Sequence, residues 1–250
     1  MDAAEYIDAL TRAGDRIVFV LGGLDLETPV PSCPEWVARD LVRHVAGVHS
    51  WARAIVGGRL VAQPGRDMEQ LVGGWPPDDE LLDWFAAGYR DLARVLREAP
   101  EQLQCWTFLE AESPLLHWAR RQAHETSIHR VDAELTAGLD PEPFVPAFAS
   151  DGVDELVMAF ITRRNSGPRS VSPTSFGMQS TDSGEAWTVY YDDQKAVSVR
   201  SSDPDADALV RAPASDLYQW VWHRLPRDSA ELVGDPKVID DWNTVHVRWS

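Results

Sequence analysis

A glutamate and a histidine spaced four residues apart are the pair in this sequence best suited to bind a metal ion. Glu125 and His129 lie in SPLLHWARRQAHETSIHRVDAELTAG (residues 113–138), which we predict to be one long helix. Residues four apart on a helix share a face, with Cβ atoms roughly 6 Å apart. A carboxylate and an imidazole at that separation can hold one divalent ion, and a third ligand must come from another element.

The best candidate for the third ligand is His44, in DLVRHVAGVHSWA (residues 40–52). Two histidines and one carboxylate leave an open position on the ion, which is the pattern of catalytic zinc. Asp132, one turn beyond His129, could orient that imidazole by accepting its second N–H. The same residues are also compatible with core histidines, a surface carboxylate at Glu125, and a surface ion pair of Asp132 with a nearby arginine.

Composition excludes several other classes of function. The net charge of −17, from 40 acidic and 23 basic residues, argues against nucleic acid or an anionic membrane as a partner. Cys33 and Cys105 have no paired spacing, so we assign neither a disulfide nor a metal ligand to them. The acidic N-terminus and the absence of a long apolar run predict a cytoplasmic protein without a membrane segment. No Walker loop, GxGxxG or GxSxG motif supports nucleotide binding or serine hydrolysis.

A helical period governs the first two thirds of the chain. The predicted helices are residues 3–24, 35–56, 78–99, 113–138 and 147–164. Ser32 or Cys33 is expected to cap the second helix, with Pro34 in its first turn. The connection 59–77 could be a lid over the site or a surface excursion.

The pattern changes after residue 167. We predict strands within 176–202 joined by a hairpin at Asp192-Asp193, then a strand at 208–212, a helix at 214–225, a strand at 231–233 and a helix at 236–242. The tail VHVRW (245–249) alternates and could add an edge strand. The predicted class is α+β, with a helical bundle over 1–167 followed by a small α+β domain over 168–250.

Two motifs together resemble a known family. SCPEWVARDLVRHVAGVHSWA (32–52) and ARRQAHETSIHRVDAEL (119–135), followed by the strand-rich tail and DLYQWVWHR (216–224), are similar to the mycothiol-dependent maleylpyruvate isomerase family of the DinB-like superfamily. The resemblance implies a DinB-like bundle, a sterol-carrier-like C-terminal domain, and a zinc or similar ion held by His44, Glu125 and His129. It also implies a C-terminal arginine that assists catalysis. Arg224 occupies its place, although the family more often has glycine where His223 stands.

The resemblance implies an enzyme that activates mycothiol, a low-molecular-weight thiol, for attack on an electrophilic small molecule, as an isomerase or an S-transferase. Arg224 would then hold a substrate carboxylate, although a cation at a helix C-terminus is an equally simple explanation of its position. Two other functions stay open. One is a metal-dependent hydrolase or cyclase that uses no thiol, and the other is a non-catalytic small-molecule-binding protein. The sequence leaves the substrate, the metal and the choice between monomer and homodimer undetermined.

Overall fold

The chain folds into two compact units, Met1–Glu142 and Pro143–Ser250. The computed structural model describes residues 1–65, 68–111, 113–163 and 166–245. A helical first unit followed by an α+β second unit confirms the predicted fold class.

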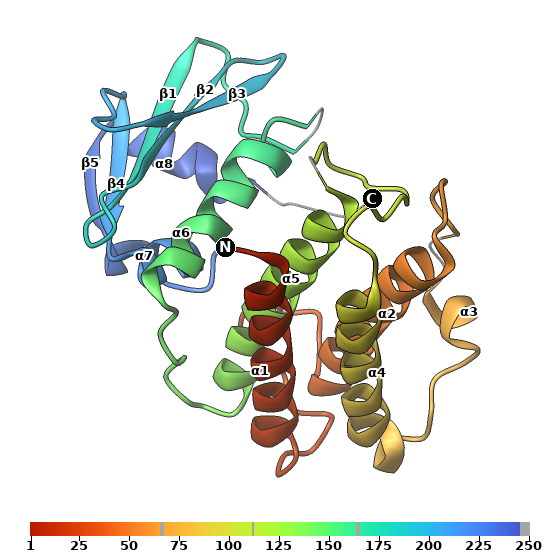
Figure 1. Ribbon diagram of the computed structural model, residues 1–250. Helices are drawn as coiled ribbons and strands as arrows, with labels where there is room; N and C mark the ends of the chain where they lie inside the picture. Colours follow the sequence, from red (N-terminus) through yellow and green to blue (C-terminus); the bar gives the residue numbers. More distant parts are fainter. Residues whose placement is uncertain (66–67, 112, 164–165, 246–250) are drawn as a thin grey trace. The chain divides into compact units, whose positions relative to one another are not determined.

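The first unit is a bundle of long helices. Its helices are α1 (Ala3–Leu21), α2 (Ala38–Gly58), the short α3 (Met68–Val72), α4 (Asp78–Glu98) and α5 (Pro114–Thr136). The long helices lie side by side (Figure 1), with α5 packed against α1 and α2, and α4 against the same two helices. This packing brings α2 and α5, which carry the three predicted metal ligands, into direct contact.

Local signals explain where α1 begins and where α5 begins and ends. The carboxylate of Asp2 accepts from the Glu5 backbone N–H at 2.9 Å, and that of Glu5 accepts from the Asp2 N–H at 2.7 Å, which closes a capping box. Ser113 caps α5 ahead of Pro114. Gly138 follows α5 with a φ of 69°, the left-handed conformation that glycine adopts freely. The limits of α5 therefore match the prediction closely.

Helix α2 begins later than predicted, at Ala38, and neither Ser32 nor Cys33 is its cap. The preceding segment forms a turn in which the Cys33 N–H donates to the Val30 carbonyl and the Trp36 N–H to the Cys33 carbonyl. The backbone N–H of Val37 instead donates to the Asp40 carboxylate at 3.0 Å. Trp36 therefore lies in this turn, before the start of α2, and is not part of the helix.

The second unit is built around a five-stranded sheet of order β3-β2-β1-β4-β5. Its strands are β1 (Thr174–Ser180), β2 (Ala186–Tyr191), β3 (Ala196–Ser201), β4 (Ala208–Ala212) and β5 (Glu231–Gly234). Strands β1 and β4 are parallel and the other neighbours are antiparallel. Asp192 and Asp193 lie in the turn between β2 and β3, as predicted.

Helices cover the sheet on the face of Phe176. The helices of this unit are α6 (Pro146–Asp154), the π-helix η1 (Glu155–Phe160), α7 (Ala214–Val221), the 3-10 turn η2 (Arg227–Ser229) and α8 (Pro236–Asn243). The ring of Phe176 on β1 lies 6.1 Å from that of Trp220 on α7 and 5.5 Å from that of Trp242 on α8. Aromatic packing of this kind buries the core between the sheet and the helices.

The unit boundary differs from the predicted one. We expected the division after residue 167, whereas it falls between Glu142 and Pro143 because α6 packs on α7 within the second unit. The periodic segment 147–164 also ends as a π-helix at Phe160. The possible edge strand at 245–249 lies outside the described residues beyond Val245. No helix in the described part of the chain has both the length and the apolar character that a membrane crossing requires.

Candidate metal centre

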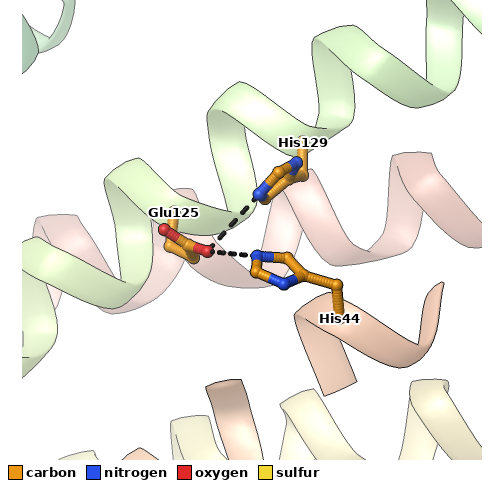
Figure 2. Close-up of side chains that lie close together, drawn as sticks. All are labelled: His44, Glu125 and His129. Carbon is orange, nitrogen blue, oxygen red and sulfur yellow. Dashed lines mark hydrogen bonds and ion pairs between the residues drawn. The ribbon is translucent and has the colours of Figure 1, made fainter. Parts of the chain in front are cut away.

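The three predicted ligands meet in the first unit, between α2 and α5. His44 Nε2 lies 3.0 Å from Glu125 Oε1, and His129 Nε2 lies 3.4 Å from the same oxygen (Figure 2). One ligand atom from each residue lies within 4.8 Å of the other two. Two imidazole nitrogens and a carboxylate oxygen, each directed at one region of space, are a donor set that suits zinc and related divalent ions. The residues therefore fit the ion that the sequence predicts.

Asp132 lies beside His129, one turn along α5. Its Oδ2 is 2.7 Å from His129 Nδ1. A carboxylate can only accept, so Nδ1 carries the proton and the lone pair of the neutral imidazole is on Nε2. Nε2 is the atom that faces Glu125. Ser32 Oγ donates to the other oxygen of Asp132 at 2.5 Å, and Cys33 Sγ lies 3.9 Å from Oδ2.

A buried arginine holds the other oxygen of Glu125. Arg121 Nη2 donates to Glu125 Oε2 at 2.9 Å, and both side chains are almost completely buried. Burial raises the pKa of Glu125, but hydrogen bonds to His129 and His44 and the charge of Arg121 outweigh it and lower that pKa well below its usual range. Burial lowers the pKa of His129, but Asp132 and Glu125 raise it to about 9. In the metal-free state the two groups thus form a charged pair, and a metal ion must displace the proton of His129.

The centre opens to solvent on the side of His44. The side chain of His44 is 28% exposed, against 3% for Glu125 and 8% for His129. His44 lines a pocket of about 500 Å³ whose other described lining residues are Glu35, Trp36, Asp40, Arg43, Met68 and Trp75. The Trp36 ring lies 4.8 Å from the His44 ring and 5.9 Å from the His129 ring, so Trp36 covers the two histidines. A small molecule can reach the centre through this pocket.

Arg224, the predicted catalytic arginine, belongs to the second unit and follows the end of α7. Its Nη1 donates to the Trp222 carbonyl at 2.6 Å, and its backbone N–H donates to the Gln219 carbonyl. His223 before it has a φ of 60°, in the left-handed region. This conformation gives a physical reason why glycine would suit the position.

Comparison with known families decides what kind of protein carries this centre. The family profile described as the mycothiol maleylpyruvate isomerase N-terminal domain matches residues 7–134, which is more than half of the chain. The MDMPI C-terminal domain profile matches residues 147–241. The chain belongs to the mycothiol maleylpyruvate isomerase family. The gap between the two matches contains the boundary at Glu142 and Pro143, so the family domains coincide with the two units.

Solved structures of the family have the same fold. A mutant of the mycothiol-dependent maleylpyruvate isomerase matches with a TM-score of 0.63 over 93% of each chain at 13% identity. A second structure of that isomerase matches with a TM-score of 0.56 over 88% of each chain, also at 13% identity. No curated protein matches the chain by sequence. At this identity the likeness supports the fold alone.

Three contributors to the centre were not predicted from the sequence. Arg121 holds Glu125. Ser32 holds Asp132. Trp36 packs on the two histidine rings. The i,i+4 spacing of Arg121 and Glu125 is a local signal that would have found the first contact. Ser32 and Trp36 reach the site through the turn before α2, and no local pattern indicates that turn.

Proposed function

We propose that this protein is a divalent-metal-dependent enzyme that uses mycothiol to attack an electrophilic small molecule. The observation that carries the proposal is the convergence of His44 Nε2, Glu125 Oε1 and His129 Nε2 beside an open pocket. The family description, which names mycothiol and maleylpyruvate isomerase, supports the choice of thiol and of reaction.

In this proposal His44, Glu125 and His129 hold the ion, and zinc is the ion we expect first. A divalent ion at this position would lower the pKa of a thiol so that its thiolate predominates near neutral pH. Asp132 keeps the Nε2 lone pair of His129 directed at the centre, and Arg121 keeps the Glu125 carboxylate in place. Trp36 packs on the rings of the two histidines and supports their orientation.

The reaction that we propose is addition of the thiol to an unsaturated carbon. The sulfur forms a C–S bond, and the electron pair of the C=C bond moves toward a conjugated carbonyl group. Rotation about the resulting single bond, followed by cleavage of the C–S bond, returns the thiol and gives an isomerised product. Protonation of the carbon without cleavage gives an S-conjugate, the transferase outcome. Arg224 is proposed to hold a substrate carboxylate, as the family resemblance implies.

Metal content of the purified protein tests the proposal first. We expect stoichiometric metal in the wild type, little in His129→Ala, and unchanged content in His124→Ala. His124 is a matched control because it is a buried histidine of α5 outside the ligand set, packed against Tyr6. Circular dichroism would establish that each variant is folded.

Turnover of maleylpyruvate with and without mycothiol is the second measurement. Dependence on both metal and thiol supports the isomerase. Metal-dependent turnover of a substrate without thiol would favour a hydrolase or cyclase. A folded wild type that takes up no zinc would overturn the catalytic-metal proposal and leave a small-molecule-binding protein as the better interpretation.

A further inference from the structure

Arg43 is the arginine among the described residues that line the pocket beside the metal centre. It precedes His44 on α2, and both side chains line the same pocket of about 500 Å³. The guanidinium carbon of Arg43 lies 5.8 Å from the ring centroid of Trp75, which also lines the pocket. A guanidinium that packs on an indole is held in orientation while its N–H groups remain available at the edge of its plane.

The hydrogen-bonding capacity of Arg43 is not filled by the described residues. Its Nε is buried and has no hydrogen-bond partner among them. Its Nη2 lies 3.8 Å from Asp78 Oδ1, which is too long for a hydrogen bond. Asp78 forms only this long ion pair with Arg43 and accepts its hydrogen bonds from Arg39, from Nε at 2.9 Å and from Nη2 at 2.6 Å. The side chain of Arg43 is 31% exposed, so its terminal Nη1 and Nη2 groups, rather than the buried Nε, are the donors that can bind a carboxylate in two-point fashion.

The acidic side chains of the pocket restrict the charge of a ligand. Asp40 already accepts the backbone N–H of Val37 at 3.0 Å, and Glu35 is exposed to solvent. These two carboxylates would repel a highly charged anion such as a nucleotide. A compact carboxylic acid with an apolar segment fits the lining better, because Trp36, Met68 and Trp75 offer apolar surface.

We propose that Arg43 binds a carboxylate of the electrophilic substrate, whose apolar part packs on Trp36 and Trp75. The electrophilic character of the substrate rests on the function proposed above. The carboxylate-binding role of Arg43 does not, because it needs neither a metal ion nor a thiol. Arg43 is thus a positioning and specificity-determining residue of the first unit, and this role is independent of Arg224.

Calorimetric titration with cinnamate tests this role. Cinnamate is a planar unsaturated monocarboxylate, and cinnamamide is its uncharged analogue. The full-length protein would be titrated both metal-free and zinc-loaded, with circular dichroism to establish folding. We expect Arg43→Gln to weaken cinnamate binding by about tenfold or more, the size of effect typical of a charge-assisted two-point contact, and to leave cinnamamide binding unchanged. Arg43→Lys should recover only part of the affinity, since a lysine lacks the planar fork.

Arg53→Gln is the matched control. Arg53 also lies on α2 but pairs with Asp91 at 2.7 Å and does not line the pocket. We expect wild-type affinity from this variant. The proposal is overturned if wild type does not bind cinnamate, if Arg43→Gln binds it as wild type does, if the loss is shared by cinnamamide, or if Arg53→Gln shows the same loss.

The two proposals fail in different measurements. Arg43→Gln should retain the zinc content of the wild type, because Arg43 is not a ligand. If the wild type takes up no zinc but its metal-free form binds cinnamate through Arg43, the metal-dependent function is wrong and the carboxylate site stands. In a catalytically active preparation, Arg43→Gln should raise KM for a carboxylate substrate more than it lowers kcat.

Discussion

Nδ1 of His129 lies 2.7 Å from Oδ2 of Asp132, and the Asp132 side chain is completely buried. A buried carboxylate that is held on its other oxygen by Ser32 has little freedom to move. It fixes both the tautomer and the ring orientation of the imidazole, so that Nε2 faces Glu125. We therefore expect Asp132 to act on the candidate centre through His129 rather than as a ligand of its own.

Replacement of Asp132 by asparagine should weaken zinc binding by roughly 10–100-fold, the effect typical of losing a residue that hydrogen-bonds to a metal ligand. An amide keeps the size of the side chain but removes the charge that favours an Nδ1 proton. Competition with a chromophoric zinc chelator measures this affinity. Ser32→Ala is the control, because it removes one hydrogen bond and keeps the carboxylate, so its affinity should stay nearer to that of wild type. Equal affinity of Asp132→Asn and wild type would contradict this role.

The sequence predicted the elements with strong local signals. Helices α4 and α5 lie within about two residues of their predicted limits because acidic residues, prolines and a glycine mark their ends. The unit boundary was misplaced because the pattern of 147–164 is helical in either unit, and only the packing of α6 on α7 assigns it to the second. That packing joins segments about 60 residues apart in the chain, and no local pattern encodes it.

Of the candidate centre, too, only the features with a local signal could be predicted from the sequence. The spacing of Glu125 and His129 follows from helix geometry, and their common face could be predicted. The approach of His44 to Glu125 depends on the contact between α2 and α5 and was only a hypothesis before the fold was known. Trp36 and Arg43 line one pocket because of the turn before α2 and the connection that carries Trp75. Neither this turn nor this connection has a periodic pattern of apolar residues from which its path could be predicted.

His117 on α5 should make the protein sensitive to acid. Burial, together with the charges of Arg121 and Arg120, lowers the pKa of His117 to about 3. The unfolded chain, with a histidine pKa near 6.5, binds a proton that the folded protein excludes. The free energy of unfolding therefore falls as the pH drops from about 6.5 toward 3, by up to about 1.4 kcal/mol per pH unit from this residue.

Urea unfolding of wild type and His117→Leu at a series of pH values measures that contribution. Above pH 6.5 the two stability curves should run parallel, which serves as the internal control. Between about pH 6 and pH 4 the variant should lose stability less steeply than wild type. Parallel curves throughout this range would mean that His117 accepts a proton in the folded state.

His223 ends α7 in a left-handed conformation, with a φ of 60°. Its Nε2–H donates to the Val245 carbonyl at 2.9 Å, which partly offsets the backbone strain. His223→Ala should lose that bond and keep the strain, whereas His223→Gly should lose the bond and relieve the strain. We expect the glycine variant to be more stable than the alanine variant by about 1 kcal/mol in urea unfolding.

Thr244 at the end of α8 is the matched control, because its φ is −86°. There the order should reverse, with Thr244→Ala more stable than Thr244→Gly, since glycine only adds freedom to the unfolded chain. If alanine were as stable as glycine at position 223, backbone strain would not govern which residue is favoured there. His223 would then owe its place to its hydrogen bond with Val245, and the turn that leads into Arg224 would depend on that side chain rather than on the backbone.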